Sequence, residues 1–188
     1  MNLKYIILSQ LIFLSLFCKS QNLSDAAISI INLDIIYYGG YKQISYPSGD
    51  VEPNTGVCSD VVIRALRITG IDLQKEIHED MSQNFHLYPN NWGLKKPDKN
   101  IDHRRVYNQM KYFERIGISI PISDKSEDYK TGDIVVWNLG GGLTHIGIVI
   151  DRMSLDKKRN LIVHNIGGGQ IAEDILFDYK IIGHYRFK

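Results

Sequence analysis

Cys58 is the residue of this 188-residue chain whose type and position best fit nucleophilic chemistry. It follows a loop rich in glycine, proline, asparagine and aspartate (41–57) and lies in the first turn of a predicted helix. Unpaired backbone N–H groups and the positive end of the helix dipole face a side chain at that position and favour a thiolate. We therefore predict a lowered pKa and a reactive thiol. The alternative is a small buried hydrophobic residue, which is what most free cysteines are.

A cysteine nucleophile needs a base, and His145 is the best placed of the six histidines. It opens a predicted strand, where alternation places it on one face with Gly147, so that the glycine leaves room beside the ring. His164 ends the next hydrophobic run, and His164 or Asn165 would reach His145 if the two strands pair as a hairpin. Nucleophile, base and orienting residue would then be complete. The alternative for each histidine is a surface position or a satisfied place in the core.

A charged stretch at the start of another predicted helix is a candidate binding site. His103, Arg104 and Arg105 follow one another there, and Trp92 lies in the loop before them. Two arginines beside an aromatic ring and a histidine suit the carboxylates of a substrate, so these four residues are substrate-binding candidates. The alternative is a solvated helix start.

The histidines do not form a metal-binding pattern. His78 and His86 are eight residues apart, whereas ligands on one face of a helix are spaced by three or four. We therefore expect no metal site and no cofactor.

Residues 1–20 have the pattern of a secretory signal peptide, with a lysine, an apolar run from Tyr5 to Phe17 and a small residue at the exit. The run is shorter than the roughly 20 apolar residues that span a bilayer. We expect an exported protein, periplasmic or extracellular, with no stable membrane span once the signal is removed. A lipoprotein attached through Cys18 is the alternative, which the bulky Phe17 disfavours.

The mature chain, residues 21–188, is close to neutral. Two of the 22 basic residues, Lys4 and Lys19, lie in the signal, which leaves 20 against 21 acidic residues. Without a long basic run, nucleic acid is not an expected partner. The length and the 44% of hydrophobic residues fit a single domain, and we expect a monomer.

Hydrophobic spacing separates helices from strands along the chain. The expected elements are helices over 23–38, 57–69, 72–85 and 103–116 and strands over 134–137, 146–150, 161–163 and 181–187. The turns between the strands are short enough for hairpins, which predicts an antiparallel sheet. The fold class is therefore α+β, with N-terminal helices packed on a C-terminal antiparallel sheet.

The order Cys58, His145, His164 resembles the NlpC-type branch of the papain-like cysteine peptidases, exported bacterial enzymes that cut peptidoglycan stem peptides. Four motifs are similar, more narrowly, to the bacterial family called domain of unknown function 1287: Gly56-Val57-Cys58-Ser59-Asp60, Asn100-Ile101-Asp102-His103-Arg104-Arg105, His145-Ile146-Gly147-Ile148-Val149 and Val163-His164-Asn165-Ile166-Gly167. The resemblance implies a papain-like fold with Cys58 as nucleophile, His145 as general base and His164 as orienting residue.

Asp60 marks a departure from that branch, in which a glycine commonly stands two residues after the cysteine. One turn into the helix, its carboxylate would cap backbone amides or contact an amine of the substrate, and capping is the favoured role. The departure leaves the substrate open.

The leading hypothesis is an exported cysteine hydrolase that cleaves amide bonds through a Cys-His-His triad, with peptidoglycan or another amide as its substrate. An acyltransferase or an amidase acting on a different amide would keep the same chemistry. A non-enzymatic envelope-binding domain and a zinc hydrolase built from histidines are the alternatives from other classes.

Overall fold

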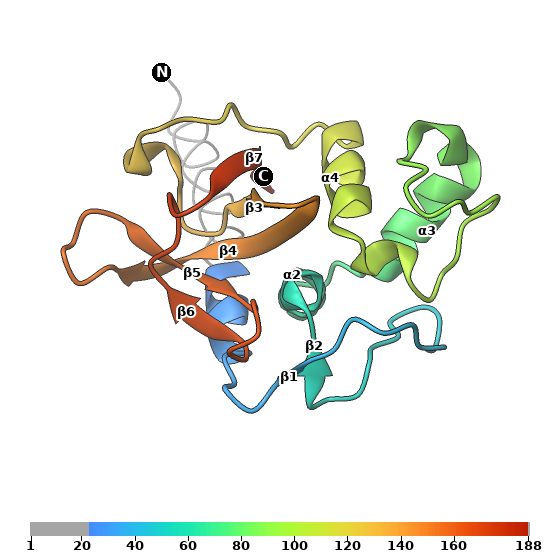
Figure 1. Ribbon diagram of the computed structural model, residues 1–188, viewed down its shortest axis with the longest axis horizontal. Coiled ribbons are helices and arrows are strands. Elements are labelled where there is room, and N and C mark those ends of the chain that lie inside the picture. Colours follow the sequence, from blue (N-terminus) through green and yellow to red (C-terminus); the bar gives the residue numbers. More distant parts are fainter. Residues whose placement is uncertain (1–22, 188) are drawn as a thin grey trace, which may run out of the picture.

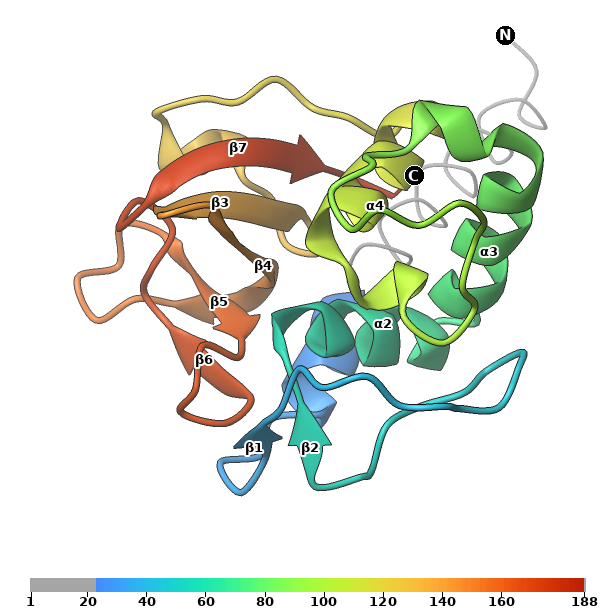
Figure 2. The ribbon, with the colours of Figure 1, turned by 45° about the vertical axis from the view of Figure 1, so that its right-hand side comes forward.

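The computed structural model describes residues 23–187 (Figure 1). The predicted signal peptide (1–20) and Cys18 lie outside the described residues. Helices α2 (Cys58–Ile68) and α4 (Val106–Arg115) both lie against a sheet, and α3 (Leu73–Asn84) lies on their side away from it (Figure 2). The chain thus has the predicted α+β architecture.

Short 3₁₀ helices connect the α-helices and precede the sheet. They are η1 (Phe85–Leu87), η2 (Asp102–Arg104) and η3 (Ser126–Asp128). The helix predicted over 103–116 is therefore divided into η2 and α4. None of the helices within residues 23–187 is long and apolar enough to cross a membrane.

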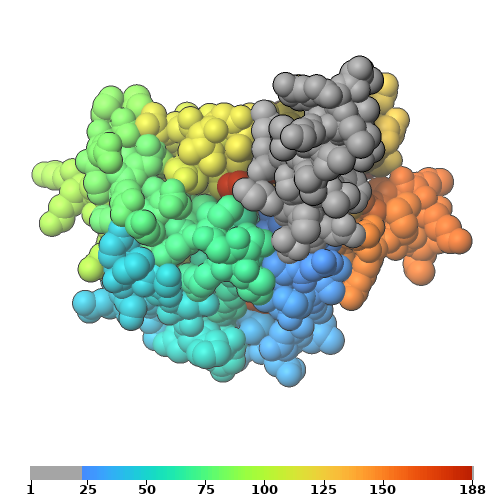
Figure 3. All heavy atoms as spheres, turned by 180° about the vertical axis from the view of Figure 1, so that it is seen from behind, coloured from blue at the N-terminus to red at the C-terminus, as the bar shows by residue number. Residues whose placement is uncertain are grey.

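The first predicted helix, 23–38, is wrong over its second half. Helical structure ends at residue 29, and Asn32 then exchanges two backbone hydrogen bonds of 2.9 Å with Gln170. Strand β1 (Ile36–Tyr37) follows and pairs in parallel with β2 (Thr55–Gly56). Pairing with distant parts of the chain therefore outweighs the local helical spacing. Seen from behind, these blue N-terminal residues lie against the turquoise to green segment with α2 and α3 (Figure 3).

The C-terminal half forms a five-stranded sheet of order β6-β5-β4-β3-β7, in which all neighbours are antiparallel. Its strands are β3 (Ile134–Gly140), β4 (Leu143–Met153), β5 (Asn160–His164), β6 (Ile171–Glu173) and β7 (Lys180–Tyr185). The antiparallel sheet was expected, whereas the three-residue strand β6 was not.

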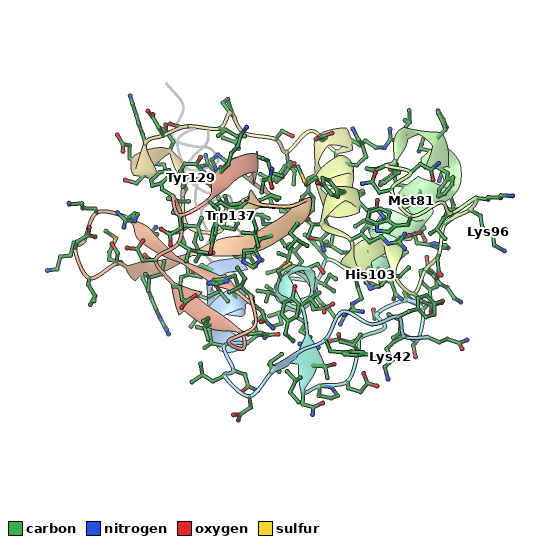
Figure 4. All side chains as sticks on the ribbon, in the orientation of Figure 1. Lys42, Met81, Lys96, His103, Tyr129 and Trp137 are labelled. Carbon is green, nitrogen blue, oxygen red and sulfur yellow. The ribbon has the colours of Figure 1, made fainter. Side chains whose placement is uncertain are left out.

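The two faces of the sheet are both buried, in different cores. Ile146, Ile148 and Ile150 of β4 join the larger core that the helices cover. Val149 and Trp137 belong instead to a smaller core, in which Trp137 is labelled in Figure 4. The indole N–H of Trp137 donates to the carbonyl oxygen of Leu176 at 2.9 Å, which closes this second core.

Candidate functional site

Cys58 is the first residue of α2, as predicted, but its surroundings differ from the expectation. The side chain is only 4% exposed. Burial raises the pKa of the thiol to about 11, and the nearby Asp60 carboxylate adds to the rise. The backbone N–H groups of Ile146 and Ser59 oppose it without overcoming it. The predicted lowering of the pKa is therefore wrong, because loss of hydration outweighs the helix terminus.

Tyr37 is a neighbour of the sulfur that the sequence did not reveal. The parallel pairing of β1 with β2 sets Tyr37 opposite Gly56, two residues before Cys58. Its hydroxyl hydrogen-bonds to the Cys58 sulfur, and burial raises the pKa of Tyr37 to about 12, with a further contribution from Cys58. Tyr37 is nevertheless 47% exposed, so one side chain both contacts the buried sulfur and reaches the solvent.

His145 and His164 meet as the hairpin prediction required. Strands β4 and β5 pair antiparallel, and His145 Nε2 lies 3.0 Å from His164 Nδ1. The rings are perpendicular and both are buried. Burial and the neighbouring His164 lower the pKa of His145 to about 3. Burial also lowers the pKa of His164. The two imidazoles are therefore neutral near pH 7.

The thiol lies against β4, the strand that carries His145. The sulfur of Cys58 lies against the backbone N–H of Ile146, the residue directly after His145. On the other side, the amide of Asn165, next to His164, donates to the carbonyl oxygen of Gly56 at 3.3 Å. The hydrogen bonds of the described residues do not include a direct one between Cys58 and His145, whose Nε2 is taken by His164. Nδ1 is thus the ring nitrogen that remains to face a nucleophile.

Gly147 lies where β5 approaches β4 closely. A Cβ at this position would lie 2.6 Å from Ile162 Cγ2, 2.9 Å from the carbonyl oxygen of Val163 and 3.1 Å from His164 Cβ. Distances of this kind require the neighbouring strand to move. The missing Cβ thus leaves room for the strand that carries His164. That Gly147 also leaves room beside the His145 ring stays a prediction.

We expect Gly147→Ala to destabilise the fold by about 1 to 3 kcal/mol, the usual range for overpacking, and to push His164 away from His145. Urea unfolding measures the first effect, and the histidine ring resonances in an NMR spectrum report the second. Gly168→Ala is the matched control, since a Cβ there would meet only Ile171 at an ordinary 3.5 Å. Equal stability of the two variants would contradict the prediction.

Asp60 and Arg104 form a buried ion pair and not an open binding site. Arg104 Nε and Nη2 donate to the two carboxylate oxygens of Asp60, each at 2.8 Å. Asp60 also accepts the backbone N–H of Val57 at 2.7 Å, which is the predicted capping role. Arg104 donates further to the carbonyl oxygens of Gly40 and Tyr38. Their predicted contact with substrate stays a prediction, and the geometry favours a bracing role for both.

His103 and Arg105 precede and follow Arg104 in the chain, and their surroundings differ. His103 is buried between the helices (Figure 4), and burial lowers its pKa to about 4. The guanidinium of Arg105 stacks on the Trp92 ring at 4.1 Å and bonds to Asp102 at 3.1 Å. The predicted grouping of Arg105 with Trp92 is therefore present, and Trp92 is 39% exposed. Whether they bind substrate stays a prediction.

Metal-ligating side chains are not gathered in residues 23–187: no three of His, Cys, Asp and Glu lie together there as a possible site.

Comparison with known proteins adds a family and a fold. The model of the family described as domain of unknown function (DUF1287) matches residues 24–187. The uncharacterized protein YijF of Escherichia coli K12 is 50% identical over 165 residues, which are 88% of this chain and 80% of YijF. Two crystal structures of an N-acetylmuramoyl-L-alanine amidase from Bacteroides uniformis, each 13% identical and each covering 90% of this chain and 99% of its own, have TM-scores of 0.54 and 0.51. At this identity the likeness concerns the fold.

Proposed function

Since this chain belongs to the DUF1287 family, whose matched region contains Cys58, His145 and His164, we propose that it is a cysteine hydrolase that cleaves an amide bond. The observation that carries the proposal is the contact of 3.0 Å between His145 and His164. The Cys58 sulfur lies against the strand that carries His145. A base whose second nitrogen is held by a polar neighbour is the arrangement of covalent acyl transfer.

The reaction begins from neutral groups, because the pKa of Cys58 lies at about 11 and that of His145 at about 3. As the sulfur attacks the amide carbon, its proton passes to His145 Nδ1, so sulfur and nitrogen must approach to hydrogen-bond distance. Such contacts are often longer before substrate binds. The new C–S bond moves the carbonyl electrons onto oxygen. When these electrons re-form the carbonyl, the C–N bond breaks and His145 gives the proton to the departing amine nitrogen, which leaves a thioester.

The oxyanion formed in this step needs hydrogen-bond donors that are already in place. The backbone N–H groups of Ile146 and Ser59 and the hydroxyl of Tyr37 all hydrogen-bond to the sulfur, so they are the candidate donors. Water then attacks the thioester and gives a proton to His145. The C–S bond breaks, His145 passes the proton to the departing sulfur, and the carboxylic acid and the free thiol are released. Atoms and charges balance without a cofactor.

Peptidoglycan stem peptides are the substrate we propose. Two lines of support point in the same direction. The predicted signal peptide would send the protein to the compartment that contains peptidoglycan. The fold is also shared with structures that bear the name N-acetylmuramoyl-L-alanine amidase.

The proposal is tested by incubating the mature protein with purified sacculi and identifying released fragments by mass spectrometry. We expect release by the wild type and by Ser82→Ala, a change on the exposed face of α3, and none by Cys58→Ala. Release by Cys58→Ala at the wild-type level would exclude the cysteine mechanism. If the wild type released nothing but hydrolysed another amide, the cell-wall substrate would be wrong and the chemistry right.

A further inference from the structure

The second nitrogen of His164 faces a carboxylate from the strand that the sequence did not predict. Glu173 ends β6, and the register that pairs His164 with Ile171 and Ile162 with Glu173 sets Glu173 diagonally across from His164 on the same face. Glu173 Oε2 lies 2.9 Å from His164 Nε2, off the straight line of a hydrogen bond. The imidazole is fully buried, whereas the Glu173 side chain is 45% exposed and can swing into line.

The three side chains form a relay in which each contact fixes the next. An ionised carboxylate can only accept a hydrogen bond, so His164 must carry its proton on Nε2 when it bonds to Glu173. His164 Nδ1 is then bare and can only accept, which requires His145 to carry its proton on Nε2. His145 Nδ1 is left with a free lone pair, which is the form that can take a proton from a thiol.

We propose that Glu173 is a positioning residue that selects the tautomers of His164 and His145 through this relay. The inference rests on the proposed function for its catalytic consequence, but not for the tautomers themselves. Without the carboxylate, a neutral His164 can place its proton on Nδ1 and donate to His145 Nε2. His145 would then carry its proton on Nδ1 and could not act as the base.

The exposure of Glu173 suits this role. A carboxylate that remains in contact with water keeps its charge at little cost, whereas the buried imidazoles lose hydration if they become cations. The ionisable groups that act on the His145 and His164 rings are each other and Glu173, and the Trp137 ring lies beside His145. Glu173 can therefore supply an acceptor without turning the buried base into an imidazolium.

The test is a measurement of histidine tautomers by ¹⁵N NMR at pH 7 on the mature protein. In the wild type we expect the proton of both His145 and His164 on Nε2. Glu173→Ala should give a mixture or the Nδ1 form, and Glu173→Gln, whose amide oxygen can still accept, should restore most of the wild-type pattern. Asp174→Asn is the matched control, because the neighbouring Asp174 pairs with Arg159.

Unchanged tautomers in Glu173→Ala, or a wild type that already carries protons on Nδ1, would overturn the inference. A second measurement is kinetic: we expect kcat to fall by about 10- to 100-fold in Glu173→Ala with KM little changed, and to recover in Glu173→Gln. A wild type with no hydrolase activity but with tautomers that depend on Glu173 would reject the proposed function and leave the positioning role supported.

Discussion

His145→Ala is expected to lower the rate of amide hydrolysis by about 10³-fold or more, because the Cys58 proton then has no acceptor. The effect should exceed what general acid–base catalysis alone contributes in water, since the thiol is buried and its pKa is about 11. At neutral pH nearly all of the Cys58 thiol stays protonated and unreactive. Initial rates on sacculi measure the effect.

The pH profile distinguishes the loss of a base from a general loss of structure. With His145 present and its pKa at about 3, the base is already neutral at pH 6, so the wild-type rate should change little between pH 6 and 9. Without it, the residual rate depends on the ionisation of the thiol. It should rise about tenfold per pH unit until it approaches the pKa of Cys58.

His86→Gln is the control, since His86 is exposed on η1 and far along the chain from the site. Thermal unfolding of all variants shows whether the fold is kept, and His145→Gln provides a less disruptive replacement should the alanine variant unfold. A wild-type activity in His145→Ala, or a flat profile of its residual rate, would show that another group takes the proton.

Alkylation of Cys58 by iodoacetamide reports the resting state without any substrate. The buried thiol should react no faster at pH 6 than a model thiol, in contrast to the lowered pKa that its position in the chain suggested.

The position of Cys58 at the start of a helix was predictable because a polar loop before an apolar helical run is a local signal. Burial was not, because it depends on residues such as Tyr37 and Ile146, which come from distant strands.

The length of the strands explains why the histidine pair was predictable and why the positions of Tyr37 and Glu173 were not. His145 and His164 lie on long, strongly hydrophobic strands joined by a short connection, so their pairing is visible in the local pattern. Strands β1 and β6 have two and three residues, too few to show a period. What fixes them is pairing across the fold, including that of Asn32 with Gln170.

Breaking the buried pair of Asp60 and Arg104 should have the largest effect on stability. Arg104→Met leaves the Asp60 carboxylate without its bidentate partner in a place where both side chains are only 2 to 3% exposed. Removing one member of such a pair typically costs about 3 to 5 kcal/mol, because the remaining charge is neither solvated nor paired. Urea unfolding of Arg104→Met and of Asp60→Asn against the wild type measures this.

Lys111→Met, which removes a surface pair with Glu114, is the control and should cost less than about 1 kcal/mol. The double variant Asp60→Asn, Arg104→Met should be less destabilised than the sum of the single variants, since neither charge is then left alone. Additive effects would contradict the pairing.

The activity of the double variant distinguishes two roles of Arg104: holding the backbone near Tyr37 in place, and neutralising the buried Asp60 carboxylate. Arg104 also donates to the carbonyl oxygens of Tyr38, the residue after Tyr37, and of Gly40. Loss of those contacts should free β1 from its place beside Cys58 even when the charges are gone. We therefore expect hydrolysis in the double variant to stay well below the wild-type rate at a temperature where both proteins are fully folded. Recovery of both stability and activity would show that Arg104 serves only to neutralise Asp60.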